Sequence, residues 1–498
     1  MNWNSDIRKG VFWPPLVLLL VALIMSLVAN EPFVEAMKAS NDFILNQFGT
    51  AFVVVSLMLI VLCLVVFISP LGRVKIGGAE AAPILSRWRW FAIILCTTIA
   101  TGILFWGTAE PLFHLKASRA QFGFSSQEAE LFAMSSLFLH WSFSPYAIYS
   151  IPAMMFALAY YNKGYTFSIQ AMLFPFQKLA VIGKIRSVID AACLFALVAG
   201  MSASLGAGIL TLSGGLGSIL GVKVDFWGQL IVTLLIVATF CVSSVSGLMK
   251  GIRVLSSINI WIFAFIALFI LFAGPLEFIT SSLFKWLGEY IGTFGSKNLL
   301  LFTEHDEWAK SWTVFNWANW MAWAPVTALF LGKIAKGYTV REFLLFNWVI
   351  PSVFAIIWMS ILGGSAVFYQ QNGTLDLLGA LDRLGPESII YQILEHLPLS
   401  DIVIAVFLFA VFLSYVTAAD SNTDAIADLS TVGLSPAMIV KIIWGLLIGV
   451  VALVMINAAG IDGVKMLSNL GGLPVMVLLV VTSFAVVKLL FQSEVLDD

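Results

Sequence analysis

Apolar stretches of about 20 residues follow one another along almost the whole chain. Of its 498 residues, 60% are hydrophobic and only 11% are charged, and the mean hydropathy is +0.98. A helix of about 20 apolar residues crosses the hydrocarbon of a bilayer, so the sequence predicts an all-α membrane protein. The first stretch, 11–29, lacks a small-residue cleavage site and is followed by many more spans, so we interpret it as a span and not a signal peptide.

On this length criterion the sequence predicts twelve transmembrane helices. Their predicted limits are 11–30, 50–69, 88–109, 128–160, 186–213, 227–247, 252–276, 312–333, 343–369, 400–428, 436–458 and 466–490. The segment 281–302 is shorter and more interrupted, with apolar residues at helical spacing, which predicts a surface helix at the membrane interface.

The distribution of basic residues predicts the orientation. Most of the 26 lysines and arginines fall in loops on the side of the two termini, and five acidic residues between 277 and 307 fall on the other side. Because cytoplasmic loops are enriched in Lys and Arg, we expect a multi-pass protein of the cell membrane with both termini in the cytoplasm. The net charge of −2 excludes a basic nucleic-acid binder, and the four cysteines lie in apolar runs, which argues against disulfides.

Glycine, proline and small polar residues interrupt four of the predicted spans. The segments are Thr97–Gly102, Ala199–Gly208, Pro325 with Thr327, and Ser414–Ser421. Unwound backbone survives in a membrane only where it lines protein or a cavity, and matched broken helices are typical of secondary transporters built from inverted repeats. We expect functional unwinding in the third and eighth spans, whereas we interpret the small residues of the fifth as sites of close helix packing.

This reading divides the chain into four parts. They are a tail with two leading helices (1–87), a first five-helix repeat with the interfacial helix (88–302), a second five-helix repeat (303–490) and a short tail (491–498).

Tryptophans gather inside the eighth predicted span. Trp317, Trp320 and Trp323 advance by three residues and therefore share one broad face of a helix. Indole rings directed into a protein interior can form the wall of a pocket for a cation without a proton to donate, such as a quaternary ammonium.

Three segments of the chain carry a family resemblance. They are Gly102–Pro111 (GILFWGTAEP), His140–Tyr149 (HWSFSPYAIY) and Trp312–Phe343, which begins WTVFNWANWMAWAP. With these segments the chain resembles the betaine/carnitine/choline transporter family over essentially its whole length. The resemblance implies a leucine-transporter-like fold of five plus five inverted-repeat helices after two leading helices, and usually a homotrimer. It also implies trimethylammonium substrates held by an aromatic box.

By match to the family's motifs, the aromatic box takes its residues from the fourth and eighth spans. The resemblance implies as substrate-binding residues Trp141, Tyr146, Tyr149 and Trp320, with Trp323 on the cytoplasmic side of the route. The family's usual Trp-Trp pair is here Asn319-Trp320, which removes one ring of the route. A trimethylammonium group has no N–H, so aromatic faces and not hydrogen bonds must recognise it.

The broken third span bears on the choice of substrate. The family's glycine betaine carriers read Gly-x-Gly-x-Gly here, and choline-type members tend to have an acid at the last position, where this chain has Gly102. A zwitterion that brings its own carboxylate therefore fits better than choline. Backbone N–H groups of Ala100–Gly102, with the hydroxyls of Thr98 and Thr101, are the predicted carboxylate ligands.

The residues do not decide which ion, if any, drives transport. In sodium-coupled members two adjacent hydroxyls lie on the tenth span, and here the pair is Thr417-Ala418, so Thr417 is at most a remnant metal ligand. The second sodium site falls on Leu197 and Met201, and the ion stand-ins of sodium-independent exchangers fall on Asn259 and Thr327. We expect weak or absent sodium dependence and no cofactor.

Four ionisable residues near the spans are expected to have structural or gating roles and not to carry protons. Asp420 and Asp424 are expected at a helix end or in a salt bridge, Glu110 at the extracellular mouth as a cap or gate, and His140 as a hydrogen-bonded packing residue.

Other functions remain as alternatives. A transporter of choline or of a sulfonium or amine-oxide osmolyte would use the same box, and so would a precursor/product exchanger. A cation channel would need rings of charge along a polar stripe. An enzyme is not expected, because the four histidines are scattered and form no His-x-x-His or Glu-x-x-His pattern.

Overall fold

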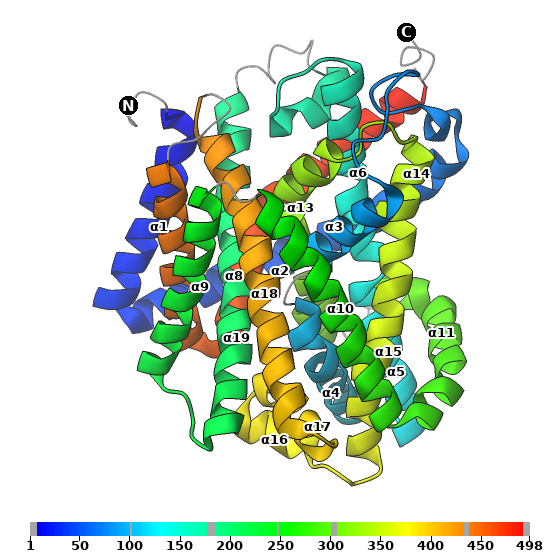
Figure 1. Ribbon diagram of the computed structural model, residues 1–498, viewed down its shortest axis with the longest axis vertical. Coiled ribbons are helices and arrows are strands. Elements are labelled where there is room, and N and C mark those ends of the chain that lie inside the picture. Colours follow the sequence, from blue (N-terminus) through cyan, green and yellow to red (C-terminus); the bar gives the residue numbers. More distant parts are fainter. Residues whose placement is uncertain are drawn as a thin grey trace.

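The computed structural model describes residues 7–99, 102–176, 185–246, 249–299, 306–432 and 438–491, and these are almost entirely helical (Figure 1). The first half contains α1 (Lys9–Val28), α2 (Asn30–Ile68), α3 (Arg87–Ile99), α4 (Gly102–Phe122), α5 (Ser126–Trp141), α6 (Phe143–Asn162), α8 (Arg186–Leu220), α9 (Phe226–Ser246), α10 (Met249–Ala273) and α11 (Leu276–Leu299). The second contains α12 (Asp306–Ala309), α13 (Phe315–Lys333), α14 (Val340–Leu344), α15 (Ile350–Gln371), α16 (Leu377–Leu384), α17 (Ile389–His396), α18 (Ser400–Ser430) and α19 (Met438–Leu490). Three 3-10 helices among the described residues are η1 (Pro70–Arg73), η2 (Ile169–Phe176) and η6 (Pro386–Ser388). Two short π-helices are η4 (Lys310–Val314) and η5 (Leu345–Val349).

The predicted spans are mostly helical where the structure describes them, with non-helical residues at Ala29, Ser69, Ser142, Gly274 and Pro275. Six described helices are long and apolar enough to cross a membrane, or seven if the bent pair α10 and α11 counts as one. Helix α19 holds the last two predicted spans, which meet at Gly460, where φ is +56°. Several other predicted spans are divided into shorter helices, so twelve remains a prediction.

The helix breaks differ from the prediction. Helix α3 ends at Ile99 and α4 begins at Gly102, and the residues between them lie outside the described residues. The eighth span is not unwound, because α13 continues through Pro325 after the wide turn η4. Helices α8 and α18 are also continuous, as close packing would require.

An unexpected break divides the fourth predicted span at Ser142. This residue leaves the helical region, with φ −118° and ψ −117°, between α5 and α6. The reason is Pro145, which has no N–H to donate to the carbonyl of Trp141 four residues earlier. The break separates Trp141 from Tyr146 and Tyr149 and so sets how these side chains can converge.

The predicted surface helix corresponds to α11. It leaves the described part of α10 at an angle of 106°, just after Gly274 and Pro275. The residue before a proline is biased away from the helical region, so this dipeptide is a natural place for the chain to turn. Two short helices beyond α15, namely α16 and α17, were not predicted.

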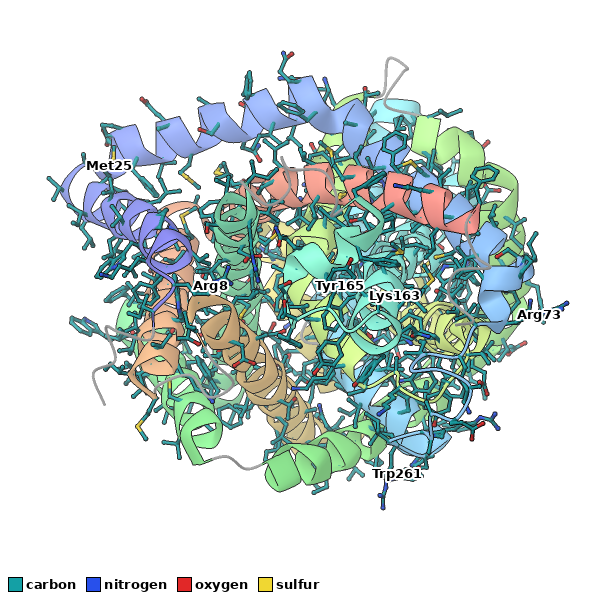
Figure 2. The ribbon with its side chains drawn as sticks, turned by 90° about the horizontal axis from the view of Figure 1, so that it is seen from above. Arg8, Met25, Arg73, Lys163, Tyr165 and Trp261 are labelled. Carbon is teal, nitrogen blue, oxygen red and sulfur yellow. The ribbon has the colours of Figure 1, made fainter. Side chains whose placement is uncertain are left out.

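Helices α1 and α2 lie along the outside of the bundle (Figures 1 and 2). Their outer faces expose large apolar side chains, among them Val17, Leu18, Ile24, Val54 and Leu64. Contiguous exposed apolar surface on this scale is the expected lipid-facing surface of a membrane protein.

Helix α13 lies in the interior and packs against α6, α8 and α19. Two glycines permit the closest approaches. A Cβ at Gly472 of α19 would lie 2.4 Å from the Ala318 carbonyl oxygen, and one at Gly332 would lie 2.8 Å from the Ala153 carbonyl oxygen. Small residues at such crossings are typical of membrane helix packing, and they hold the tryptophan face of α13 against its neighbours.

Candidate functional site: an aromatic cavity

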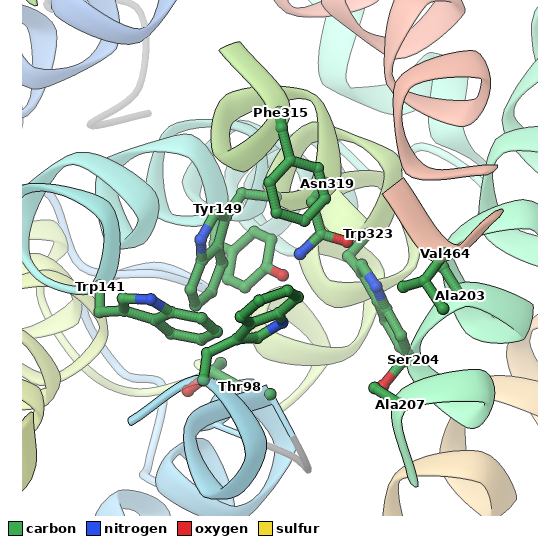
Figure 3. A pocket seen from close by; sticks show the side chains of 13 residues that line it. Thr98, Trp141, Tyr149, Ala203, Ser204, Ala207, Phe315, Asn319, Trp323 and Val464 are labelled. Atoms are coloured by element: carbon green, nitrogen blue, oxygen red, sulfur yellow. The ribbon is translucent and has the colours of Figure 1, made fainter. Parts of the chain in front are cut away.

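A cavity of about 50 Å³ lies where α3, α4, α5, α6, α8, α13 and α19 meet (Figure 3). Its walls are Thr98, Gly102, Trp106, Trp141, Tyr149, Ala203, Ser204, Ala207, Phe315, Asn319, Trp320, Trp323 and Val464. Six of these residues are aromatic, and no Asp, Glu, Lys or Arg is among them. The cavity is therefore suited to a group that is recognised by π-faces.

Trp320 is the centre of the aromatic wall. Its ring centroid lies 5.5 Å from that of Trp141, 5.7 Å from Tyr146 and 5.1 Å from Tyr149, with the rings inclined to one another. The Trp320 Nε1–H donates to the carbonyl oxygen of His140 at 3.1 Å, which fixes the orientation of the indole. The structure thus brings together all four predicted box residues, although Tyr146 stands behind Trp320 and not on the cavity wall.

Trp323 also lines the cavity, on the side of α8. Its indole packs against Gly200, where a Cβ would lie 3.2 Å from the Trp323 Nε1. Asn319, which precedes Trp320, accepts a hydrogen bond from the Ser468 hydroxyl at 2.9 Å. The amide therefore links α13 to α19 at the cavity wall.

Gly102 lines the cavity, and the space at this position admits only a glycine. A Cβ at this position would lie 2.9 Å from Cη2 of Trp141, so only glycine lets this indole lie across the start of α4. Thr98 lines the cavity as well, and its hydroxyl donates to the Ile94 carbonyl at 2.9 Å. The other two predicted carboxylate ligands, Ala100 and Thr101, lie outside the described residues.

Sequence reasoning missed two aromatic walls, Trp106 of α4 and Phe315 of α13. Both stand inside the segments that carry the family resemblance, GILFWGTAEP and WTVFNWANW, but their direction could not be deduced from spacing. The two rings lie 6.0 Å apart between centroids and meet at a steep angle.

A buried carboxylate stands directly behind the box. Glu110 is fully buried, and its Oε2 accepts a hydrogen bond from the Trp141 Nε1–H at 2.7 Å. Its Oε1 lies 2.6 Å from His140 Nδ1 and 3.1 Å from His114 Nε2. Glu110 is therefore a structural anchor of the box, and the expectation that it caps or gates at the extracellular mouth finds no support in this geometry.

The surrounding hydrogen bonds assign the protonation of this cluster. The Trp308 Nε1–H donates to His114 Nδ1 at 3.3 Å, so the proton of His114 is on Nε2 and faces Glu110. His140 Nδ1 lies against the same carboxylate, while its Nε2 lies 3.1 Å from the Thr313 hydroxyl. Two imidazoles and one indole thus surround the Glu110 carboxylate with hydrogen-bond donors, which is how a buried charge is stabilised. His140 is a hydrogen-bonded packing residue, as expected.

By composition this cluster is also the candidate metal centre among the described residues. The ligand atoms of Glu110, His114 and His140 all lie within 4.8 Å of one another. However, each of them already has a hydrogen-bond partner, and the direct contacts inside the cluster fill the position that an ion would occupy.

Two residues of the predicted ion sites, Thr417 and Asn259, make hydrogen bonds within the protein. The Thr417 hydroxyl donates to the Leu413 carbonyl of its own helix at 2.8 Å. Asn259 donates from Nδ2 to the Ser414 hydroxyl at 2.8 Å, which ties α10 to α18. The side chains of Asp420 and Asp424 lie outside the described residues, so the expectation for them stays a prediction.

Comparison with known proteins decides the family. The profile of the betaine/carnitine/choline family of transporters matches residues 10–495. The chain belongs to this family. The glycine betaine transporter OpuD of Bacillus subtilis is 31% identical to this transporter, over 95% of the chain and 93% of the relative. The ectoine/hydroxyectoine transporter of Virgibacillus pantothenticus is 29% identical over 99% of the chain and 98% of the relative.

Solved structures similar to this transporter include a sodium-coupled symporter. The Na⁺-coupled sialic acid symporter in its substrate-bound outward-open state has a TM-score of 0.45 and 17% sequence identity, over 89% of this chain and 86% of that one. The family and its relatives are transporters and not enzymes, and the transporter is a multi-pass membrane protein.

Proposed function

We propose that this protein is a secondary active transporter of trimethylammonium zwitterions, such as glycine betaine or carnitine, that works by alternating access. The observation that carries the proposal is the convergence of Trp106, Trp141, Tyr149, Trp320 and Trp323 from four helices on one cavity, whose described wall residues include no Asp, Glu, Lys or Arg. Aromatic faces attract a weakly hydrated onium by about 2 kcal/mol or more for each desolvated contact.

The zwitterionic class is supported by the absence of an acid at Gly102 and by the names of the relatives, which include glycine betaine and ectoine transporters. The carboxylate would bind near Thr98, where α3 ends and α4 begins, at the positive end of the α4 dipole. Choline, a sulfonium or amine-oxide osmolyte, and exchange of a precursor for its product remain the alternatives within the same box.

Coupling and assembly are proposed from the sequence. Because Ala418 has replaced a hydroxyl, we propose that sodium has little effect on transport. We further propose a homotrimer in the cell membrane, with the termini in the cytoplasm, as in the family. Multi-angle light scattering of the purified protein tests the oligomeric state, and a monomer would reject it.

The deciding experiment is a thermal-shift panel on the purified transporter. Glycine betaine, carnitine, γ-butyrobetaine, choline, dimethylsulfoniopropionate and ectoine are each added in Na⁺ or in K⁺ buffer. The trimethylammonium zwitterions should raise the unfolding temperature most, because a ligand that binds only the folded state stabilises it. Stabilisation by none of the onium compounds would reject the proposal.

A further inference from the structure

A lysine ammonium lies inside a second group of aromatic rings, directly beside the cavity. Nζ of Lys465 is 3.8 Å from the ring centroid of Trp312 and 5.2 Å from that of Phe315. It is also 5.9 Å from the centroids of Trp106 and Phe113. Four rings from α4, η4 and α13 thus surround the end of a side chain that comes from α19.

The charge of Lys465 is not neutralised by an ion pair within the described chain. The carboxylates that act on it electrostatically are Asp462, on its own helix, and Glu110. Glu110 is already engaged by Trp141 and the two histidines. Aromatic faces attract a cation without cancelling its field, so the positive charge extends into the neighbouring space.

That neighbouring space is the substrate cavity. Trp106 and Phe315 belong to both sites: they contact the Lys465 ammonium and they line the cavity. Val464, the residue before the lysine, lines the cavity too, and Figure 3 shows it on the side opposite Trp141. The ammonium is therefore separated from the cavity by little more than an aromatic ring.

The cavity thus has two differently charged sides. Behind Trp141 lies the Glu110 carboxylate, and behind Phe315 and Trp106 lies the Lys465 ammonium. A zwitterion can place its onium against the aromatic wall around Trp320, and the field of Lys465 then favours the carboxylate that it also carries. A net cation such as choline gains nothing on the second side and meets repulsion there.

We propose that Lys465 is a specificity-determining residue, whose charge makes the cavity select zwitterions over net cations of the same onium chemistry. The inference rests on the proposed function, because it assumes that the cavity binds the substrate. The Lys465 charge would be a second reason for the preference for zwitterions, separate from the missing acid at Gly102.

The test compares affinities for glycine betaine and choline by calorimetry on the purified transporter. The wild type should prefer glycine betaine, and Lys465→Met, which keeps the length of the side chain but not its charge, should reduce the ratio of the two affinities about tenfold. Lys465→Arg should keep the ratio. Lys285→Met, at an exposed lysine of α11, is the matched control and should change nothing.

An unchanged ratio in Lys465→Met would overturn the inference. If that variant does not fold, the wild type alone decides with glycine betaine and its methyl ester, which has the same onium but a net positive charge. Equal affinity for acid and ester would also overturn it. Failure of the wild type to bind either onium compound would instead reject the proposed function, so the two failures can be distinguished.

Discussion

Two aromatic groups stand side by side in this transporter and share Trp106 and Phe315. One surrounds the ammonium of Lys465, and the other, around Trp320, encloses open space. The occupied group shows that rings alone can surround a positive charge inside this bundle, without an ion pair from the described residues. The open group has the same chemistry but is free for a ligand that arrives from outside.

The two aromatic groups differ because one holds the tethered lysine ammonium and the other would hold a free ligand. A lysine ammonium is tethered, so it loses little translational freedom when it enters its cage, whereas a free ligand must recover that entropy from contacts. The open cavity accordingly has more rings, and one of them is anchored through the Trp141 Nε1–H to a buried carboxylate. Four measurements test this contrast, beginning with the largest expected effect.

Removal of the central ring should eliminate the open site. Trp320→Leu should weaken glycine betaine binding about 100-fold or more, because one cation–π contact is lost and three neighbouring rings lose their support. Calorimetry measures the affinity, and thermal unfolding shows whether the variant is folded. Trp261→Leu, at an exposed tryptophan of α10, is the control. Unchanged affinity in Trp320→Leu would remove this residue from the site.

Neutralising Glu110, which holds Trp141, should loosen the open cavity and leave the aromatic rings around Lys465 in place. Glu110→Gln presents an amide N–H₂ to a site with three donors, and unsatisfied buried polar groups cost about 1–3 kcal/mol each. We expect a lower unfolding temperature and about tenfold weaker binding of glycine betaine and choline alike. A variant with wild-type stability and affinity would show that Glu110 does not support the box.

Adding one methyl group at Gly102 should weaken binding in the open cavity by less than the two changes above. Gly102→Ala places a Cβ 2.9 Å from Trp141, so the indole must shift by a few tenths of an ångström. Binding should weaken about threefold to tenfold, because off-position side chains in a packed site typically cost up to a few kcal/mol. Gly292→Ala, where the Cβ meets no atom within 4 Å, should leave affinity unchanged. Equal affinities in the two variants would contradict the role of Gly102.

Sodium should have the smallest effect. Uptake of glycine betaine into liposomes should change by less than about threefold between Na⁺ and K⁺ gradients, because paired hydroxyls and carbonyls are needed to bind the ion and Ala418 lacks one. A tenfold stimulation by Na⁺ would contradict the proposed weak coupling.

The contrast between the two aromatic groups also shows where sequence reasoning stops. The periodicity of three placed Trp317, Trp320 and Trp323 on one helix face, but only Trp320 and Trp323 line the cavity. Trp317 is fully buried and packs near His140 instead. Spacing along one helix cannot tell which rings meet those of another helix.

The sequence by itself determined that this is a helical membrane protein, where its apolar helices run, and which rings were candidates for binding. The first two follow from composition and local spacing, because hydrocarbon length and helix geometry are properties of a single segment, whereas the candidate rings came from the family resemblance. Only the tertiary structure decided that the chain breaks at Ser142, that Glu110 anchors Trp141, and that Lys465 stands behind the cavity wall. Each of these depends on contacts between segments far apart in the chain, where packing and buried hydrogen bonds set the geometry.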